Sequence, residues 1–584
     1  MKERILRGIP INGDFGYGEI EVYSPQLPVI EKKEISAEEI FQEKERLDKA
    51  ITLTKEDFEK IYQKVRAEMG KDIAEFIKIQ IAFLTDETVI KEAKELIEKG
   101  RVSAEYAYSE VIKRYYHNLA SKGVSVFVDK SSEIFDVCLY VLKKLKDSKK
   151  GFSLLFPDKK CLLFAHTLTP MNMAILDKEY ILGIALEMGG KTSHISIMAK
   201  AKEIPAVVGV ENLLQFSSKV KEAIIDGNRG LVILSPTEKR IKFYEKEKEE
   251  LGKRRKALIT QKEQEAKTKD GKYVDISANI EFVYEAVMAK EYGAKGIGLF
   301  RTEYLFLSKR ELPSEEEQYQ FYKEVAEKMK PYFVIIRTFD LGGDKIIPGY
   351  FENNPFLGWR GIRFCLSNLN FFKTQLRAIL RASQTRNIKV MLPMVSNIDE
   401  VIKTKNILEE IKQELKEKNI DFDENIELGI MIETPSSVLL SDVLAKLCSF
   451  FSIGSNDLTQ YTLACDRGNE KVSYLFSHYH PAVLRLIKET IKNGHRNGIW
   501  VGLCGELASE PFGIIILIGM GIDELSMAPQ FIPYAKELIS FLDTDFCKEI
   551  AEKVINFSTP SEVLRYLKKR IKKEKIPLEK YSYV

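Results

Sequence analysis

Residues 428–461 read LGIMIETPSSVLLSDVLAKLCSFFSIGSNDLTQY. An apolar run ends at the acidic Glu433, a helical segment follows, and a second apolar run ends in the polar pair Asn456-Asp457. Short apolar runs bounded by turn residues are typical of buried strands, and the segment between them has the length of a helix. The stretch therefore predicts a strand, a helix and a second strand, with polar side chains where each strand ends.

The same unit repeats from Gly271 onward. The predicted strands are Val274–Asn279, Gly296–Arg301, Phe333–Asp340, Val390–Met394, Leu428–Glu433, Phe450–Asp457, Trp500–Glu506 and Glu524–Met527. Eight strands that alternate with helices over about 300 residues predict a (β/α)8 TIM barrel, which we assign to residues 268–584. The active site of such a barrel lies at the carboxyl ends of its strands.

Polar and charged residues gather at those predicted strand ends. They are Arg301-Thr302-Glu303, Arg337-Thr338-x-Asp340, Glu433-Thr434, Asn456-Asp457 and Cys504-Gly505-Glu506, with Arg360 and Arg467 in nearby loops. A surface salt bridge could explain any one of these arginines and carboxylates. Their concentration on one predicted face of a barrel favours an active site for the set as a whole.

This set contains two kinds of ligand. Guanidinium groups are rigid forks of N–H donors that match phosphate and carboxylate, so Arg301, Arg337 and Arg467 suit a multiply charged anion. Glu433 and Asp457 supply the hard oxygen ligands that Mg²⁺ prefers. Cations around a phosphate are what phosphoryl transfer requires, so we expect the substrate to be a small phosphorylated acid.

The cysteines exclude two classes of site. There are seven, an odd number, widely spread and without any CxxC pair, which argues against a disulfide framework and a structural zinc site. Cys504 differs from the others because it lies at the carboxyl end of the predicted barrel strand Trp500–Glu506. There a thiol could exchange a proton with the substrate, although an inert buried thiol fits the position equally well.

The first half of the chain has a different organisation. Residues 1–25 and 146–236 contain short strands and predict one α/β domain, while 26–145 predict a helical domain inserted within it. The predicted helices of the insert are Glu43–Met69, Asp72–Phe83, Glu87–Glu98 and Ala104–Leu119. Residues 237–267 are dense in Lys and Glu and predict a solvated helical linker to the barrel.

His194 lies at the predicted start of a helix in this α/β domain, after Gly189-Gly190-Lys191-Thr192-Ser193. The glycines allow a sharp turn, the hydroxyl residues suit a helix cap, and the helix N-terminus favours a phosphoryl group. A lone histidine at such a place is more often merely exposed. The phosphate ligands of the barrel favour a phosphohistidine, carried by a domain that swivels to reach them.

Composition narrows the function classes further. Lys and Arg number 89 against 86 Asp and Glu, so no bulk charge favours binding to nucleic acid or to a membrane surface. The N-terminal residues 1–7 lack the apolar core of a signal peptide, and no run approaches about 18 uncharged apolar residues. We expect a cytoplasmic protein of several domains, with no membrane insertion.

Four motifs resemble those of Enzyme I, the phosphoenolpyruvate-protein phosphotransferase family of the bacterial sugar phosphotransferase system. They are GGKTSHISIMA at 189–199, FFSIGSNDLTQY at 450–461, DRGN at 466–469 and GLCGE at 502–506. The resemblance extends over nearly the whole chain, and the order of the domains agrees. It implies a Mg²⁺-dependent transfer from phosphoenolpyruvate to Nε2 of His194 and then to a histidine of the phosphocarrier protein HPr, as the first step of sugar uptake.

The resemblance also implies a role for each site residue. Arg301, Arg337, Asn456, Asp457 and Arg467 would bind phosphoenolpyruvate, Glu433 and Asp457 would bind the metal, and Cys504 would protonate the enolpyruvate to give pyruvate. Arg360 is a weaker candidate for the same pocket. The barrel would form a homodimer, and the helical insert would dock HPr.

The departures from the family pattern lie outside the barrel, at Gln80, Phe135, Met173 and Lys191. They leave room for an HPr-like acceptor in a regulatory cascade. A relative of pyruvate phosphate dikinase or phosphoenolpyruvate synthase would need an ATP-binding domain, for which we find neither space nor a P-loop motif. A regulatory protein without catalysis would not need the full set of site residues.

Overall fold

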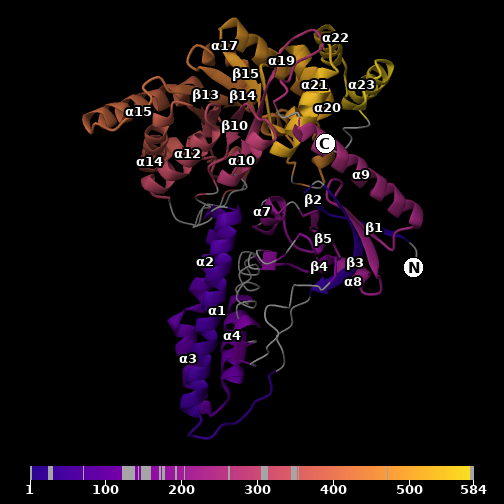
Figure 1. Cartoon of the computed structure of the whole chain (residues 1–584). Helices are drawn as coiled ribbons and strands as arrows, with labels where there is room; N and C mark the ends of the chain where they lie inside the picture. Colours follow the sequence, from indigo (N-terminus) through magenta and orange to yellow (C-terminus); the bar gives the residue numbers. More distant parts are fainter. Residues whose placement is uncertain are drawn as a thin grey trace. The chain divides into compact units, whose positions relative to one another are not determined.

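The computed structural model divides the chain into two compact units, Met1–Gly252 and Lys253–Ser582 (Figure 1). The structure describes residues 3–12, 14–23, 30–69, 71–120, 139–142, 144–145, 159–169, 172–173, 176, 178–190, 194–202, 204–260, 263–303, 305, 313–342, 352, 354–467, 469 and 471–578. No helix in these ranges is both long enough and apolar enough to cross a lipid bilayer.

The first unit is built on one mixed sheet with the strand order β1-β8-β7-β3-β4-β5-β6-β2. Its strands are β1 (Arg4–Arg7), β2 (Ile9–Asn12), β3 (Phe15–Tyr23), β4 (Cys161–Ala165), β5 (Ile181–Leu186), β6 (Ala206–Val208), β7 (Glu222–Asp226) and β8 (Leu231–Leu234). Buried aliphatic and aromatic side chains of these strands, such as Leu162, Phe164 and Ile225, form its core. The N-terminal strands join this sheet, as their apolar pattern predicts.

Among the described residues, four long helices lie between β3 and β4 in the chain, and β3 pairs directly with β4 in parallel. They are α1 (Ile40–Met69), α2 (Lys71–Leu84), α3 (Glu87–Gly100) and α4 (Ala104–Ala120). All four of the helices predicted between residues 43 and 119 are therefore present. Their apolar stripes pack on one another: Leu47 and Phe58 of α1, Ile97 of α3 and Val111 of α4 are all fully buried.

Further helices among the described residues belong wholly or partly to this unit, including α7 (His194–Ala201), α8 (Leu213–Ser217) and α9 (Glu238–Thr260). The charged segment expected to be solvated is indeed helical, but its first turns pack on the sheet. Tyr244 is buried against Phe15 and donates a hydrogen bond to Asp226 Oδ2 at 2.8 Å. A few apolar side chains within a Lys- and Glu-rich sequence are enough to hold this part of the helix in place.

The second unit contains a closed barrel of eight parallel strands, which confirms the predicted (β/α)8 fold. The strands are β9 (Asp275–Ile280), β10 (Gly296–Phe300), β11 (Phe333–Arg337), β12 (Ile388–Leu392), β13 (Glu427–Ile432), β14 (Phe450–Ile453), β15 (Trp500–Leu503) and β16 (Glu524–Met527). The helices between and after them are α10 (Val283–Glu291), α12 (Glu315–Met329), α13 (Ile362–Ser367), α14 (Leu369–Ala382), α15 (Ile398–Glu417), α16 (Pro435–Leu439), α17 (Ser441–Leu444), α18 (Ser455–Leu463), α19 (Pro481–Arg496), α20 (Pro511–Met520), α21 (Ile532–Ser540), α22 (Thr544–Val554) and α23 (Pro560–Lys573).

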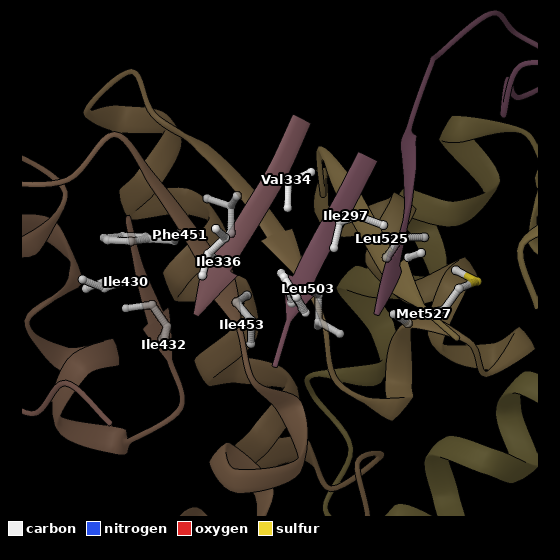
Figure 2. Close-up of a cluster of buried hydrophobic side chains, with 14 of the residues drawn as sticks. Ile297, Val334, Ile336, Ile430, Ile432, Phe451, Ile453, Leu503, Leu525 and Met527 are labelled. Atoms are coloured by element: carbon white, nitrogen blue, oxygen red, sulfur yellow. The ribbon is translucent and has the colours of Figure 1, made fainter. Parts of the chain in front are cut away.

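The barrel strands bury both of their faces. Figure 2 shows residues such as Val334, Ile336 and Ile430, which belong to the large apolar cluster shared with the surrounding helices. The alternate residues fill the barrel interior, where Leu299, Ile335, Met391, Met431, Phe450 and Cys504 form a separate buried cluster. Burial of both faces explains why the sequences of the barrel strands are almost continuously apolar.

Six predicted strands extend too far at their carboxyl ends, three of them by three or more residues. β14 ends at Ile453 and α18 begins at Ser455, so Asn456 and Asp457 lie in the first turn of a helix and not on the strand. β11 ends at Arg337, before Asp340, and β15 ends at Leu503, before Cys504. Ser, Asn and Asp compete for backbone hydrogen bonds and favour helix starts, which explains why β14 stops before Ser455.

Candidate active site

Arg337 forms the centre of a buried charge cluster at the carboxyl end of β11. Its Nη2 donates to Glu303 Oε1 at 3.0 Å, and its Nη1 lies 3.3 Å from Asp340 Oδ2. Burial alone would lower the pKa of Arg337, but the two carboxylates outweigh burial and raise it above the ordinary value. The guanidinium is therefore charged at every physiological pH and is held in a fixed orientation.

Arg360 belongs to the same cluster. Its Nε donates to Asp340 Oδ1 at 3.1 Å, its Nη2 to Asp340 Oδ2 at 2.7 Å, and its Nη1 to Tyr461 Oη at 3.1 Å. The loop can approach because Gly342 has a φ of +99°, and a Cβ there would lie 2.3 Å from the Trp359 carbonyl oxygen. A residue that sequence reasoning treats as a weaker candidate is thus at the centre of the site.

Tyr461 and the carboxylates Glu303 and Asp340 are site residues to which sequence reasoning assigns no role. The signal for Tyr461 was available, because it follows Asp457 by four residues and so lies on the same face of α18. Asp340 was visible as a charge after a predicted strand. Its contacts with two arginines depend on the loop of Arg360, whose path the sequence pattern does not specify.

Arg301 and Arg467 are the more accessible arginines of the predicted set. Arg301 directly follows β10, its Nη1 donates to Glu281 Oε1 at 2.8 Å, and its side chain is 42% exposed. Arg467 lies in the loop after α18, where its backbone amide donates to Gln460 Oε1 at 3.2 Å and its side chain is exposed. Arg467 is thus exposed, whereas Arg301 would have to leave Glu281 to reach an anion.

Asn456 links two of the loops. Its Oδ1 accepts a hydrogen bond from the backbone amide of Glu506 at 3.0 Å, which joins the first turn of α18 to the segment after β15. Gly505 in that segment is packed tightly, because a Cβ there would lie 1.9 Å from Ser455 Oγ. The glycine-rich sequence around Cys504 is thus required by the close approach of α18.

Glu433 and Asp457 form a pair of carboxylates, of which Glu433 is buried and Asp457 is half-buried. Glu433 Oε1 accepts a hydrogen bond from the Met394 amide at 2.6 Å. Within the described part of the chain, Glu433 Oε2 and Asp457 Oδ1 have no hydrogen-bond partner. Burial, followed by repulsion from Asp457 and Asp340, raises the pKa of Glu433 to about 8. A cation between the two carboxylates would offset both the cost of burying their charge and their mutual repulsion.

The donor set fits Mg²⁺ better than a soft metal. The described residues contain no group of three or more His, Cys, Asp or Glu side chains able to hold a metal ion. Mg²⁺ commonly uses one or two protein carboxylates and completes its shell with substrate oxygens and water, whereas zinc takes three or four protein ligands, mostly from His and Cys. Gly454 also leaves space, because a Cβ there would lie 3.0 Å from Glu433 Oε2.

Cys504 is the first residue after β15 and is 4% exposed. Its side chain lies with Leu299 and Met391 in the cluster that fills the barrel interior. Burial raises the pKa of Cys504 to about 12, so the group is a neutral thiol near pH 7. Such a thiol can act as a proton donor but is a poor nucleophile. All six described cysteines are free and buried.

His194 is the first residue of α7, in the first unit. The expected sharp turn precedes it, with a φ of +121° at Gly189, and Ser196 Oγ donates to the Gly190 carbonyl at 2.7 Å. Lys191, Thr192 and Ser193 lie outside the described residues, as does Phe135. The structure thus provides the helix start that was predicted for His194.

Two of the departures from the family pattern are buried. Gln80 of α2 is 1% exposed, and neither end of its amide finds a hydrogen-bond partner in the described ranges. Met173 is fully buried, and its thioether has no proton to donate. Gln80 is therefore not part of a docking surface, and Met173 cannot donate a hydrogen bond from its side chain.

Comparison with known proteins identifies the family. Three family models match, described as the N-terminal domain (7–127), the mobile domain (157–230) and the PEP-binding domain (255–544) of PEP-utilising enzymes. The phosphoenolpyruvate-protein phosphotransferase of Priestia megaterium is 38% identical over 93% of this chain and 95% of its own length. The chain belongs to the phosphoenolpyruvate-protein phosphotransferase family.

Other members of the phosphotransferase family match over similar lengths. That of Bacillus subtilis is 38% identical over 94% of this chain and 96% of its own, and that of Geobacillus stearothermophilus is 36% identical over 97% and 98%. His194 falls within the mobile-domain match. The arginines, Glu433, Asp457 and Cys504 described above all fall within the PEP-binding match.

Proposed function

We propose that this chain is an Enzyme I, which moves the phosphoryl group of phosphoenolpyruvate to His194 and then to HPr or an HPr-like protein. The cluster of two buried arginines beside two carboxylates, each with one oxygen that accepts no hydrogen bond, carries this proposal, together with the family assignment. Fixed positive charge and a cation site at one end of a barrel are what a phosphorylated acid requires.

The five residues that would bind phosphoenolpyruvate are Arg301, Arg337, Asn456, Asp457 and Arg467, and they differ in how rigidly they are held. Arg337 is fixed by Glu303 and Asp340, so its charge is preorganised where negative charge develops on the phosphoryl oxygens. Arg301, Asn456 and Arg467 would complete the site. Because Arg301 and Arg467 are exposed, they would close on the substrate as it binds.

Glu433 and Asp457 would hold Mg²⁺, the proposed cofactor. The two oxygen atoms without partners, Glu433 Oε2 and Asp457 Oδ1, support this assignment. When bound, Mg²⁺ would neutralise part of the negative charge on the substrate's phosphoryl oxygens. Arg360 would act as a positioning residue, because it lies 3.8 Å from Asp457 Oδ1 and is itself held by Asp340.

The reaction has two parts. The bond between phosphorus and the enol oxygen breaks as a bond to Nε2 of His194 forms, which leaves the enolate of pyruvate. The Cys504 thiol then gives its proton to C3 of the enolate, so that a C–H bond forms and a thiolate remains. The burial that keeps Cys504 protonated supports this role.

We propose the following division of the chain. Residues 1–25 and 146–236 form the swivelling phosphohistidine domain, 26–145 the helical domain that docks the phosphocarrier, 237–267 a linker, and 268–584 the barrel. The matched family ranges support this division in outline. A homodimer through the barrel and a cytoplasmic location are further parts of the proposal and rest on the family resemblance.

Pyruvate release tests the proposed function. The chain mixed with phosphoenolpyruvate and Mg²⁺ should release about one pyruvate per chain and then stop, because the phosphohistidine has no acceptor. Added HPr should make the release continuous. A single burst that HPr does not extend would reject HPr and favour another acceptor, and no pyruvate at all would reject the function.

A further inference from the structure

The barrel interior beneath Cys504 contains polar side chains that the proposed reaction does not use. Ser277 of β9, Ser452 of β14 and Glu524 of β16 are each no more than 1% exposed. Ser452 is paired with Gly502 of β15, and Gly502 is paired with Glu524, so these positions form one row across three strands. Since Gly502 has no side chain, Ser452 and Glu524 face a shared space.

Glu524 is fitted closely into that space. A Cβ on Gly298 would lie 2.3 Å from Glu524 Oε1, and a Cβ on Gly502 would lie 2.2 Å from Oε2. Two glycines therefore make room for one buried carboxyl group: Gly502 on the adjacent strand β15, and Gly298 on β10, which lies beyond β9 in the barrel. A carboxyl group accommodated in this way in the middle of a barrel is unusual, because the interior layers are commonly apolar.

Several polar atoms in this space have polar neighbours but form no well-aligned hydrogen bond with them. Across the described residues, Glu524 Oε1 and Oε2, Ser277 Oγ and Ser452 Oγ have no hydrogen-bond partner. Buried polar groups of this kind are commonly bridged by ordered water, which binds where two to four polar partners converge. Ser526, the next inward-facing residue of β16, differs because its hydroxyl donates to Asn279 Oδ1 at 2.6 Å.

This polar space adjoins Cys504. Cys504 follows Gly502 by two residues, so its thiol faces the same interior. The Ser452 hydroxyl is near enough to the thiol to lower its pKa, while Glu524 acts to raise it. Burial raises the pKa of Glu524 itself to about 8, although the nearby Ser277 hydroxyl opposes the rise. Glu524 therefore carries a proton near neutral pH.

We propose that Glu524, Ser277 and Ser452 enclose bound water inside the barrel, and that Glu524 exchanges a proton with Cys504 through it. The proposal rests on the proposed function, in which Cys504 is the acid. After Cys504 has protonated the enolate, an S–H bond forms again as the O–H bond of Glu524 breaks, through the water and the Ser452 hydroxyl. The Glu524 carboxylate then regains a proton from the solvent. Glu524 acts through Cys504 and does not touch the substrate.

Isotope loss from pyruvate tests this proposal. Full-length phosphorylated chain with Mg²⁺ is given methyl-deuterated pyruvate, and deuterium loss is compared with the exchange of carbon-14 between pyruvate and phosphoenolpyruvate. If Cys504 shares its proton with Glu524, the deuterium that Cys504 removes from pyruvate is replaced by solvent hydrogen while the substrate is still bound. Several deuterons are then lost for each carbon-14 exchange. Glu524→Gln should bring this ratio close to one, and the control Ser526→Ala should leave it unchanged.

The ratio separates proton exchange from damage to the fold, because a structural defect slows both processes together. A ratio that is already close to one in the wild type, or that is unchanged in Glu524→Gln, would overturn the proposal. If Glu524→Gln does not fold, Ser452→Ala provides the same comparison. Failure of the proposed function would look different: Cys504→Ser would then retain both deuterium loss and carbon exchange.

Discussion

Arg360 and Asp340 form a buried bidentate ion pair, in which Nε donates to Oδ1 at 3.1 Å and Nη2 to Oδ2 at 2.7 Å. Asp340 also lies 3.3 Å from Arg337 Nη1. One carboxylate thus orients two guanidinium groups at the end of the barrel. Their positive charge is fixed before any substrate arrives, which is the condition for strong electrostatic stabilisation of a phosphoryl group.

Asp340→Ala should therefore destabilise the barrel and weaken substrate binding. The change leaves two buried guanidinium groups without their shared partner, and breaking a buried pair in this way costs about 3–5 kcal/mol. The measurement is urea unfolding together with the KM for phosphoenolpyruvate. Glu410→Gln is the control, because Glu410 pairs with Lys373 at an exposed site and should leave both values unchanged. Wild-type stability in Asp340→Ala would contradict the account.

Glu433→Gln should remove the dependence of phosphorylation on Mg²⁺ along with most of the activity. The variant keeps the size of the side chain but loses the charge that would hold the cation. Calorimetric titration with Mg²⁺ in the presence of phosphoenolpyruvate measures the effect. Glu427→Gln at the opposite end of β13 is the matched control, since Glu427 pairs with Lys389 instead. Identical titrations of the wild type and Glu433→Gln would reject the metal assignment.

The Cys504 thiol should resist alkylation at neutral pH. Because burial raises its pKa from 9.0 in the unfolded chain to about 12, the reactive thiolate is scarce until the pH passes well above 9. Iodoacetamide labelling of the peptide that contains Cys504, followed by mass spectrometry, should be much slower in native than in urea-unfolded protein at pH 8. Fast native labelling at pH 7 would show a thiolate and contradict the role of proton donor.

The raised pKa of Cys504 also makes the free energy of unfolding depend on pH. Above pH 9 the unfolded chain releases a proton that the folded chain retains at Cys504, so this contribution to stability is present below pH 9 and is lost as the pH rises toward 12. Cys504→Ala should show a flatter decline over this range. An equal decline in both proteins would assign the pH dependence to other groups.

Gln80→Leu should stabilise the helical part of the first unit. Both ends of the buried Gln80 amide lack partners among the described residues, and a buried amide in that state costs about 1–3 kcal/mol. The urea midpoint should rise, while transfer of the phosphoryl group to HPr should not change because residue 80 is buried. The exposed Gln413, which bonds to Glu417, supplies the control Gln413→Leu. A lower midpoint would show that the Gln80 amide has a partner after all.

The periodic pattern of the sequence was sufficient to predict the barrel and the four helices of the insert. In both, apolar residues are buried at regular intervals over many residues. Local hydrogen bonding decided where the strands end, and this moved Asn456 and Asp457 onto α18. Arg360 reaches the site through a loop whose path depends on Gly342. No sequence period predicts such a path.

The polar row inside the barrel was also beyond prediction. Glu524 begins a strand, and from sequence alone a charged residue there suggests a solvent-exposed strand end. Only the register of β14, β15 and β16 brings Glu524 beside Gly502 and Ser452. The residues that carry chemistry could be listed from the sequence, but their partners could not.

Phosphorylation of His194 is the central claim, and radiolabelled phosphoenolpyruvate tests it most directly. With Mg²⁺, the chain should take up about one acid-labile phosphate, and His194→Ala should take up none. His166→Ala is the matched control, because His166 is an exposed histidine of the same unit, bonded to Glu187 at 2.8 Å, and should label normally. Acid-labile phosphate that persists in His194→Ala would contradict the account.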